Sequence, residues 1–178
     1  MPTEATTAQN LPKIKVFISY SRKDADFCER LAEALNEHGY EPVYDRSPRP
    51  NDDPETRLTA QDEWWTQLQV MIATCDVMVF IVSPESSASA VCDQEIAHAR
   101  SLGKRVIAIL RRAVDFSAAP ERLRALNVKL DFSKDSAEDF AAELDLLRAE
   151  LDHDIDWQRQ GLRLVRQAHQ WDSDGRPE

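Results

Sequence analysis

The sequence has few of the residues with which proteins build metal, redox or phosphate sites. Its four glycines never stand in a turn between an expected strand and helix, which excludes the glycine-rich loops of dinucleotide-binding and P-loop proteins. Its three cysteines are widely spaced and form no Cys-x-x-Cys pair, which indicates reduced thiols and a cytoplasmic protein. The four histidines never occur at the spacing of metal ligands. We therefore expect neither a metal nor a resident cofactor.

Long apolar runs and an excess of basic charge are also lacking. The longest apolar stretch, Val77 to Val82, is the length of a strand, whereas a helix that spans a membrane needs about 20 apolar residues. The first residues lack the basic start and apolar centre of a signal peptide. The net charge of −10 disfavours binding to phosphate backbones. We expect neither a membrane nor a nucleic acid as a partner.

The composition that remains is that of a globular domain. Hydrophobic residues make up 42% and charged residues 30% of the sequence. Its 178 residues are enough for one domain with a short appendage. We expect a loose tail at 1–13 and a core domain at 14–152. An apolar stripe through Trp157, Leu164 and Trp171 predicts an additional helix over 153–171, and residues 172–178 resemble a linker.

Short β-branched or aromatic runs alternate with helical patterns along the core domain. The alternation predicts an α/β fold with a five-stranded parallel sheet and helices on both faces. The expected strands are 15–20, 40–44, 76–82, 105–110 and 128–132. The expected helices run from a cap at Asp24 to Gly39, over 61–75, from Ser86, Ser87 or Ser89 to Leu102, and over 137–151. The segment 46–60, between the expected strand at 40–44 and the expected helix at 61–75, holds three prolines and three acidic residues. This composition predicts a long loop, and such loops are often functional or mobile.

Ligands of such sheets bind at the carboxyl ends of the strands, which directs attention to the loops after the first three strands. Glu95 is the sharpest candidate there, because it lies in the first half of its helix, where the helix dipole favours an anion. The competing interpretation is an ordinary solvated glutamate. A phospho-receiver domain has a similar outline, but its acids are replaced here by Tyr20-Ser21 and Ser83-Pro84.

Four motifs in order carry a resemblance to a known family. They are Phe17-Ile18-Ser19-Tyr20-Ser21 followed by Asp24, then Trp65, then Val79 to Pro84 followed by Ser86, and finally Cys92-x-x-Glu95. Together they resemble bacterial TIR domains. The resemblance implies a flavodoxin-like fold and, for many members, cleavage of the nicotinamide–ribose bond of NAD with Glu95 as the catalytic residue. It also implies self-assembly through the 46–60 loop into a homo-oligomer or filament, in bacterial immune defence.

Further contacts to NAD are expected from residues at the carboxyl ends of the strands, although turn formation or solvation explains each of them at least as well: Tyr20, Ser21, Arg22, Asp45, Arg46 and Ser83. Trp65 and Cys92 complete the expected set, and for these two the competing interpretation is burial in the core. One departure stands out, because many catalytic members have a tryptophan four residues before the glutamate, where this chain has Val91. Trp64 or Trp65 is the alternative aromatic wall. Adjacent helical residues face about 100° apart, so we expect one of the two to be buried.

Two other functions stay open. One is a TIR scaffold without activity, or a mimic of host signalling, which Val91 favours and Glu95 opposes. The other is a nucleoside deoxyribosyltransferase, which uses a related fold and a glutamate nucleophile. The sequence leaves open whether the product is linear or cyclic ADP-ribose, what signal activates the protein, and whether a sensor domain follows.

Overall fold

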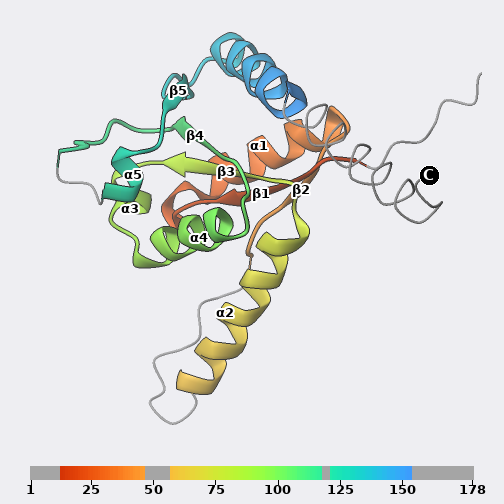
Figure 1. Ribbon diagram of the computed structural model, residues 1–178. Coiled ribbons are helices and arrows are strands. Elements are labelled where there is room, and N and C mark those ends of the chain that lie inside the picture. The colour runs from red at the N-terminus through yellow and green to blue at the C-terminus, as the bar shows by residue number, and fades with distance from the viewer. Residues whose placement is uncertain (1–12, 47–56, 118–120, 154–178) are drawn as a thin grey trace, which may run out of the picture.

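A five-stranded parallel sheet forms the centre of the protein (Figure 1). The structure is a computed structural model that describes residues 13–46, 57–117 and 121–153. The strand order β2-β1-β3-β4-β5 is that of the expected flavodoxin-like fold. The strands are β1 (Lys15–Ser19), β2 (Glu41–Val43), β3 (Val77–Val82), β4 (Val106–Leu110) and β5 (Val128–Asp131).

Helices cover both faces of the sheet, as expected (Figure 1). The α-helices are α1 (Ala25–Glu37), α2 (Arg57–Thr74), α3 (Pro84–Ser87), α4 (Ala90–Ser101) and α5 (Glu121–Arg124). A 3-10 turn, η1 (Arg22–Asp24), precedes α1, and a last helix occupies 137–153.

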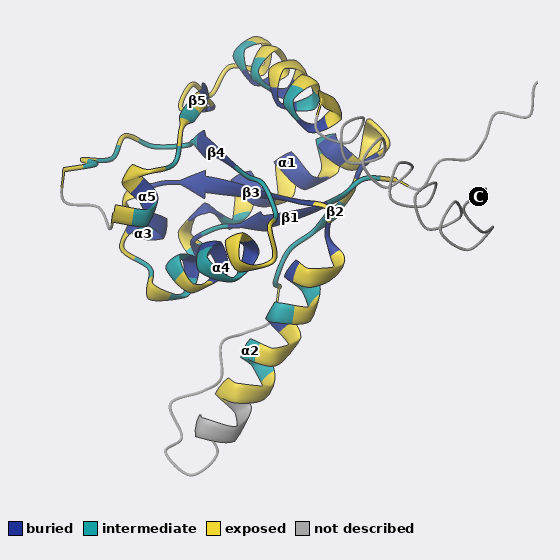
Figure 2. Cartoon of the chain, viewed as in Figure 1, coloured by how far each residue is buried: buried dark blue, intermediate teal, exposed yellow. Residues whose placement is uncertain are grey.

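Alternate side chains of β3 enter two separate apolar cores, which explains why this strand is apolar along its whole length. The core on the side of α1 and the 137–153 helix takes Val77, Val79 and Ile81, and the core on the side of α2 and α4 takes Met78, Phe80 and Val82. Figure 2 shows the central strands as the buried layer between these helices. The sheet, packed on both faces, thus fixes the positions of the loops that follow its strands.

The expected loop at 46–60 is too long, because α2 begins at Arg57. Arginine, leucine and alanine, which occur at 57, 58 and 60, are good helix formers and extend a helix at little cost. Residues 47–56 lie outside the described residues.

Caps and glycines define the helix ends near the sheet. Gly39 and Gly103 have φ angles of 89° and 69° and follow the ends of α1 and α4, as predicted. Ser89, one of three expected caps, accepts the N–H of Cys92 and starts α4. Ser83 forms a capping box at α3, so two helices rather than one follow β3.

The ends of the chain are outside the described part. The expected tail except Lys13, the added helix beyond residue 153 and the 172–178 segment all fall there. His153 is the last described residue and lies within the helix that begins at residue 137. Within the described ranges, no helix is long and apolar enough to cross a membrane.

Candidate active site at the carboxyl ends of the strands

Glu95 is a buried carboxylate on the inner face of α4. Its exposed fraction is 6%, and it shares the buried stripe of the helix with Cys92, Ile96 and Ala99. The Cys92-x-x-Glu95 spacing places both residues on one helix face. The interpretation of Glu95 as an ordinary solvated glutamate is therefore wrong.

Ser19, the last residue of β1, donates a hydrogen bond from Oγ to Oε2 of Glu95. Ser19 is 1% exposed, and a buried carboxylate is costly unless it is hydrogen-bonded. Ser19 is not among the site residues predicted from the sequence. The available signal was a hydroxyl residue at the carboxyl end of an otherwise apolar strand, inside the first TIR-like motif.

A small pocket lies in front of Glu95. Its volume is about 20 Å³, the room of about one water molecule. Its lining comes from β1, the segments after β1 and β2, α2 and α4. The residues are Phe17, Ile18, Tyr20, Arg22, Asp45, Trp64, Val91 and Glu95.

Asp45 holds the outer wall of this pocket together. Its Oδ2 accepts hydrogen bonds from Nη2 of Arg22 at 2.7 Å and from Nε1 of Trp64 at 3.0 Å. Its main-chain oxygen accepts from the Tyr20 hydroxyl at 2.9 Å and from Nη1 of Arg22 at 2.6 Å. Burial raises the pKa of Tyr20, so this hydroxyl remains a donor at neutral pH. These bonds tie the loops after β1 and β2 to α2.

The structure brings four of the sequence-predicted site residues to one pocket: Tyr20, Arg22, Asp45 and Glu95. Cys92 is adjacent and buried, with its Sγ 3.7 Å from the main-chain oxygen of Tyr20. Cys28 and Cys75 are buried elsewhere. Burial raises the pKa of the Cys28 thiol far above its usual range and that of Cys75 to about 11, so neither is a thiolate at neutral pH.

Three other predicted residues have local roles. Ser21 accepts the N–H of Lys23 at the start of η1. Arg46 is exposed, donates to the Tyr44 hydroxyl and lies over the Tyr44 ring. Ser83 is buried and caps α3. None of the three lines the Glu95 pocket.

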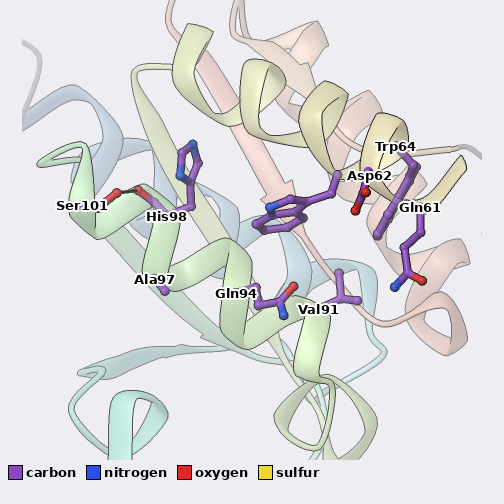
Figure 3. Close-up of a pocket in the computed structure, with 9 residues that line it drawn as sticks. Gln61, Asp62, Trp64, Val91, Gln94, Ala97, His98 and Ser101 are labelled. Carbon is purple, nitrogen blue, oxygen red and sulfur yellow. Dashed lines mark hydrogen bonds between the residues drawn. The ribbon is translucent and has the colours of Figure 1, made fainter. Parts of the chain in front are cut away.

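The two neighbouring tryptophans of α2 are both half-buried, so the expectation that one alone would be buried is wrong. Trp64 lines the Glu95 pocket, whereas Trp65 has its ring centroid 6.4 Å from that of His98 on α4, in an edge contact. Both also line a wider groove of about 710 Å³ between α2 and α4 (Figure 3). Each ring has its own partner, because Trp64 bonds to Asp45 and Trp65 contacts His98.

A second polar cluster joins the ends of β1, β3 and β4. The Asp24 carboxylate makes no cap bond to α1 and instead accepts from Oγ of Ser83 at 2.6 Å and from Nη2 of Arg112 at 2.8 Å. Arg112 also donates from Nη2 to Oε2 of Glu85 at 2.6 Å. The hydrogen bond from Arg112 lowers the pKa of Glu85. The described residues contain no group of three His, Cys, Asp or Glu side chains able to hold a metal.

The chain is similar to several solved structures at low sequence identity. The TIR domain of the Toll-related receptor TRR-2 from the lower metazoan Hydra magnipapillata superposes with a TM-score of 0.57 at 17% identity, over 77% of this chain and 97% of that one. The RPS4 and RRS1 TIR domain heterodimer gives 0.49 at 15% identity, over 80% and 97%. A CMP N-glycosidase, BcmB from Clostridium botulinum, gives 0.48 at 19% identity, over 74% and 98%. No curated protein sequence matches the chain.

The family follows from the sequence match rather than from these remote structures. A model of the TIR domain matches residues 16–148, which is more than half of the chain and contains β1 through most of the last helix. The same range contains all four motifs of the TIR resemblance. The chain belongs to the TIR domain family.

Proposed function

We propose that this TIR domain cleaves the nicotinamide–ribose bond of NAD, with Glu95 as the catalytic carboxylate. The observation that carries the proposal is the buried Glu95 side chain, which lines a pocket at the carboxyl ends of the strands and accepts a hydrogen bond from Ser19. The products would be nicotinamide and either ADP-ribose or a cyclic isomer.

One carboxylate is enough for this reaction. Glycosidases generally need a second carboxyl group to protonate the leaving oxygen. The nicotinamide of NAD is already a cation and leaves as a neutral molecule, so no acid is required. The ribose gains positive charge in the transition state, and a carboxylate in a poorly solvated pocket stabilises that charge. Glu95 has the burial that this role requires.

The pocket wall supplies groups for the rest of the dinucleotide. Arg22 and the exposed Lys23 offer positive charge to the diphosphate, with the exposed Arg46 nearby in sequence. Asp45 can accept hydrogen bonds from ribose hydroxyls, in exchange for those it now accepts from Arg22 and Trp64. Ser21 and Ser83 cap η1 and α3, and Cys92 belongs to the buried stripe of α4, so we assign these three residues a supporting role.

The pocket must open before it can hold a ribose. Its volume of about 20 Å³ is far below the ~300 Å³ or more of a small-molecule site. The Trp64–Asp45 hydrogen bond joins two residues that line the pocket. The 46–60 segment lies between these two residues in the sequence. Contact of this segment with a second TIR domain would shift the wall. Activity that depends on self-assembly, and hence on concentration, is part of the proposal.

The first test is nicotinamide release from NAD by the full chain, dilute and clustered on beads. We expect turnover on the beads and a loss of about a hundredfold or more in the Glu95→Gln variant. Glu33→Gln is the matched control, because Glu33 is an exposed glutamate on α1. Turnover that survives in clustered Glu95→Gln would exclude Glu95 as the catalytic carboxylate.

A scaffold without activity is the second candidate, favoured by Val91 and by the closed pocket. It predicts concentration-dependent assembly with no release of nicotinamide, even on beads. Exchange of a nucleoside base without NAD cleavage would indicate a deoxyribosyltransferase instead. The setting of the proposed enzyme, immune defence in a bacterial cytoplasm, rests on the family resemblance and on the three free cysteines.

A further inference from the structure

The positive charge of the Glu95 pocket is held by a carboxylate of the same chain. The described lining of this pocket contains one cation, Arg22, and two carboxylates, Asp45 and Glu95. Arg22 donates from Nη2 to Oδ2 of Asp45 at 2.7 Å and from Nη1 to the main-chain oxygen of Asp45 at 2.6 Å. Its guanidinium also lies over the ring of Tyr20. An anionic ligand that enters this pocket therefore meets an arginine already paired with Asp45.

The same carboxylate also holds the α2 side of the pocket. Oδ2 of Asp45 accepts a second hydrogen bond, from Nε1 of Trp64, at 3.0 Å. The Asp45 side chain is 12% exposed, so salt and water screen these bonds little. One oxygen thus joins the segment after β1 to α2 beside a pocket with room for about one water molecule. Displacement of this oxygen would free Arg22 and Trp64 together.

A phosphate group is a close chemical competitor of Asp45 for Arg22. A guanidinium binds carboxylate and phosphate oxygens with the same paired geometry. Lys23 follows Arg22 in the chain and is 73% exposed, so a diphosphate finds a second cation there. A phosphate bound next to the Asp45 carboxylate would be repelled by it. The anion therefore replaces Asp45 on Arg22 and does not bind alongside it.

From these contacts we propose that Asp45 is an internal inhibitor of the site, and that a ligand with a diphosphate opens the pocket by replacing Asp45 on Arg22. The displaced carboxylate moves away from the anion and releases Nε1 of Trp64. The α2 side of the pocket is then free to make room for a ribose beside Glu95. The inference rests on the proposed function for the identity of the ligand as NAD, whereas the exchange at Arg22 concerns any diphosphate.

The exchange makes the diphosphate a requirement for entry. Nicotinamide riboside has the same scissile bond as NAD but no phosphate, so it leaves Asp45 on Arg22 and the pocket closed. We expect clustered protein to release nicotinamide from the riboside at least tenfold more slowly than from NAD, since a charge-assisted bond then stays unbroken. Equal rates on the two substrates would show that no anion is needed to open the pocket.

The direct test is hydrogen exchange of the Trp64 indole N–H, followed by NMR in the full chain. Pyrophosphate is the probe, because it has two phosphates and neither a sugar nor a base. Saturating pyrophosphate should speed the exchange about tenfold or more, since the N–H loses a charged acceptor. Sodium chloride at the same ionic strength should leave the rate nearly unchanged, and Trp64→Phe identifies the signal. An N–H that is equally protected with and without pyrophosphate would overturn the proposal.

The affinity for pyrophosphate gives a second test, which a merely structural Asp45 would fail. Asp45→Asn keeps the size of the side chain and removes its charge, so Arg22 becomes available and pyrophosphate should bind about tenfold tighter. Asp62→Asn is the matched control, because Asp62 is exposed on α2 near Trp64 and does not line the Glu95 pocket (Figure 3). Its effect should be small, since exposed charges are screened. Equal changes in the two variants, or weaker binding to Asp45→Asn, would contradict an inhibitory carboxylate.

Failure of the internal inhibitor and failure of the proposed function give different results. Nicotinamide release that depends on Glu95, with a pyrophosphate affinity unchanged by Asp45→Asn, would reject the inhibitor and keep the enzyme. Pyrophosphate that releases Trp64 in a protein without NAD turnover would keep the anion exchange and reject the enzyme.

Discussion

Two carboxylates are buried at the same edge of the sheet, in different surroundings. Asp24 and Glu95 are 4% and 6% exposed. Asp24 is enclosed by Ser83 and by the guanidinium of Arg112, and it connects segments that follow three strands. Glu95 accepts from Ser19 and faces a pocket. One protein thus buries one acid within an ion pair and another beside a pocket.

Their surroundings separate a structural carboxylate from the one that we propose to be catalytic. An ion pair with several hydrogen bonds compensates the cost of burying Asp24 and fixes the loops around it. A carboxylate on a pocket wall can instead interact with a charge that appears in a bound substrate. A nearby pocket is therefore a better indicator of chemistry than burial is.

The largest expected effect comes from changing each carboxylate to its amide. Glu95→Gln should lower NAD turnover about a hundredfold or more, because the negative charge is lost where positive charge develops. Asp24→Asn should keep turnover within a few-fold and lower the free energy of unfolding by about 1 kcal/mol, because the amide retains the bond to Ser83 but not the ion pair. Nicotinamide release and urea unfolding of both variants check this. If Asn at position 24 abolished turnover in a stably folded protein, the two roles would not be separate.

A smaller effect is expected when Arg112 is replaced by methionine, which keeps much of the side-chain volume. The change leaves Asp24 buried without its guanidinium partner. Breaking a fully buried pair costs about 3–5 kcal/mol, and water near a partly exposed partner reduces this cost. Because the Arg112 side chain is 41% exposed, we expect a loss of about 2 kcal/mol in the free energy of unfolding.

The control for this prediction is the double variant Asp24→Asn with Arg112→Met. Removing both charges should recover part of the loss, because no buried charge then lacks a partner. Urea unfolding of the single and double variants measures the coupling. If the double variant lost as much free energy of unfolding as the two single variants together, or more, a structural ion pair would be contradicted.

The central sheet could be predicted from the sequence because its signals are local. The apolar run of β3 and the glycines after α1 and α4 each specify their own element. The start of α2 could not be placed, since the four residues from Arg57 to Ala60 carry no apolar period, although three of them are good helix formers. Helix ends of this kind depend on packing outside the segment.

The site was predictable where a motif carried it and not where tertiary contacts did. Glu95 was found from its position after β3 and from the family motif. Ser19 was missed because its partner is far away in sequence, and Trp64 was not separated from Trp65 because the bond to Asp45 depends on how α2 crosses the sheet. The sequence predicts Asp24 as a helix cap, because its alternative partner Arg112 lies far along the chain, in the loop after β4.

Ser19→Ala should lower NAD turnover less than Glu95→Gln does. The variant removes the hydroxyl that bonds to Oε2 of Glu95 and leaves the charge in place. Hydrogen bonds to charged groups contribute about 1.5–3 kcal/mol, so we expect turnover to fall about tenfold or somewhat more. Ser19→Thr restores a hydroxyl and should recover part of kcat. An unchanged kcat in Ser19→Ala would show that this bond does not position Glu95.

The smallest expected effect is a pH dependence of the stability of the protein, and it comes from the Arg112–Glu85 contact beside Asp24. The hydrogen bond from Arg112 lowers the pKa of Glu85, and a carboxyl whose pKa is lowered by folding stabilises the protein above its unfolded pKa. This contribution is lost as the pH falls from about 5 towards 3, where the glutamate becomes protonated. The urea midpoint of the wild type should therefore fall more over this range than that of Arg112→Met, most clearly at low salt because Glu85 is accessible to ions. Parallel curves for the two proteins would contradict a stabilising contact between Arg112 and Glu85.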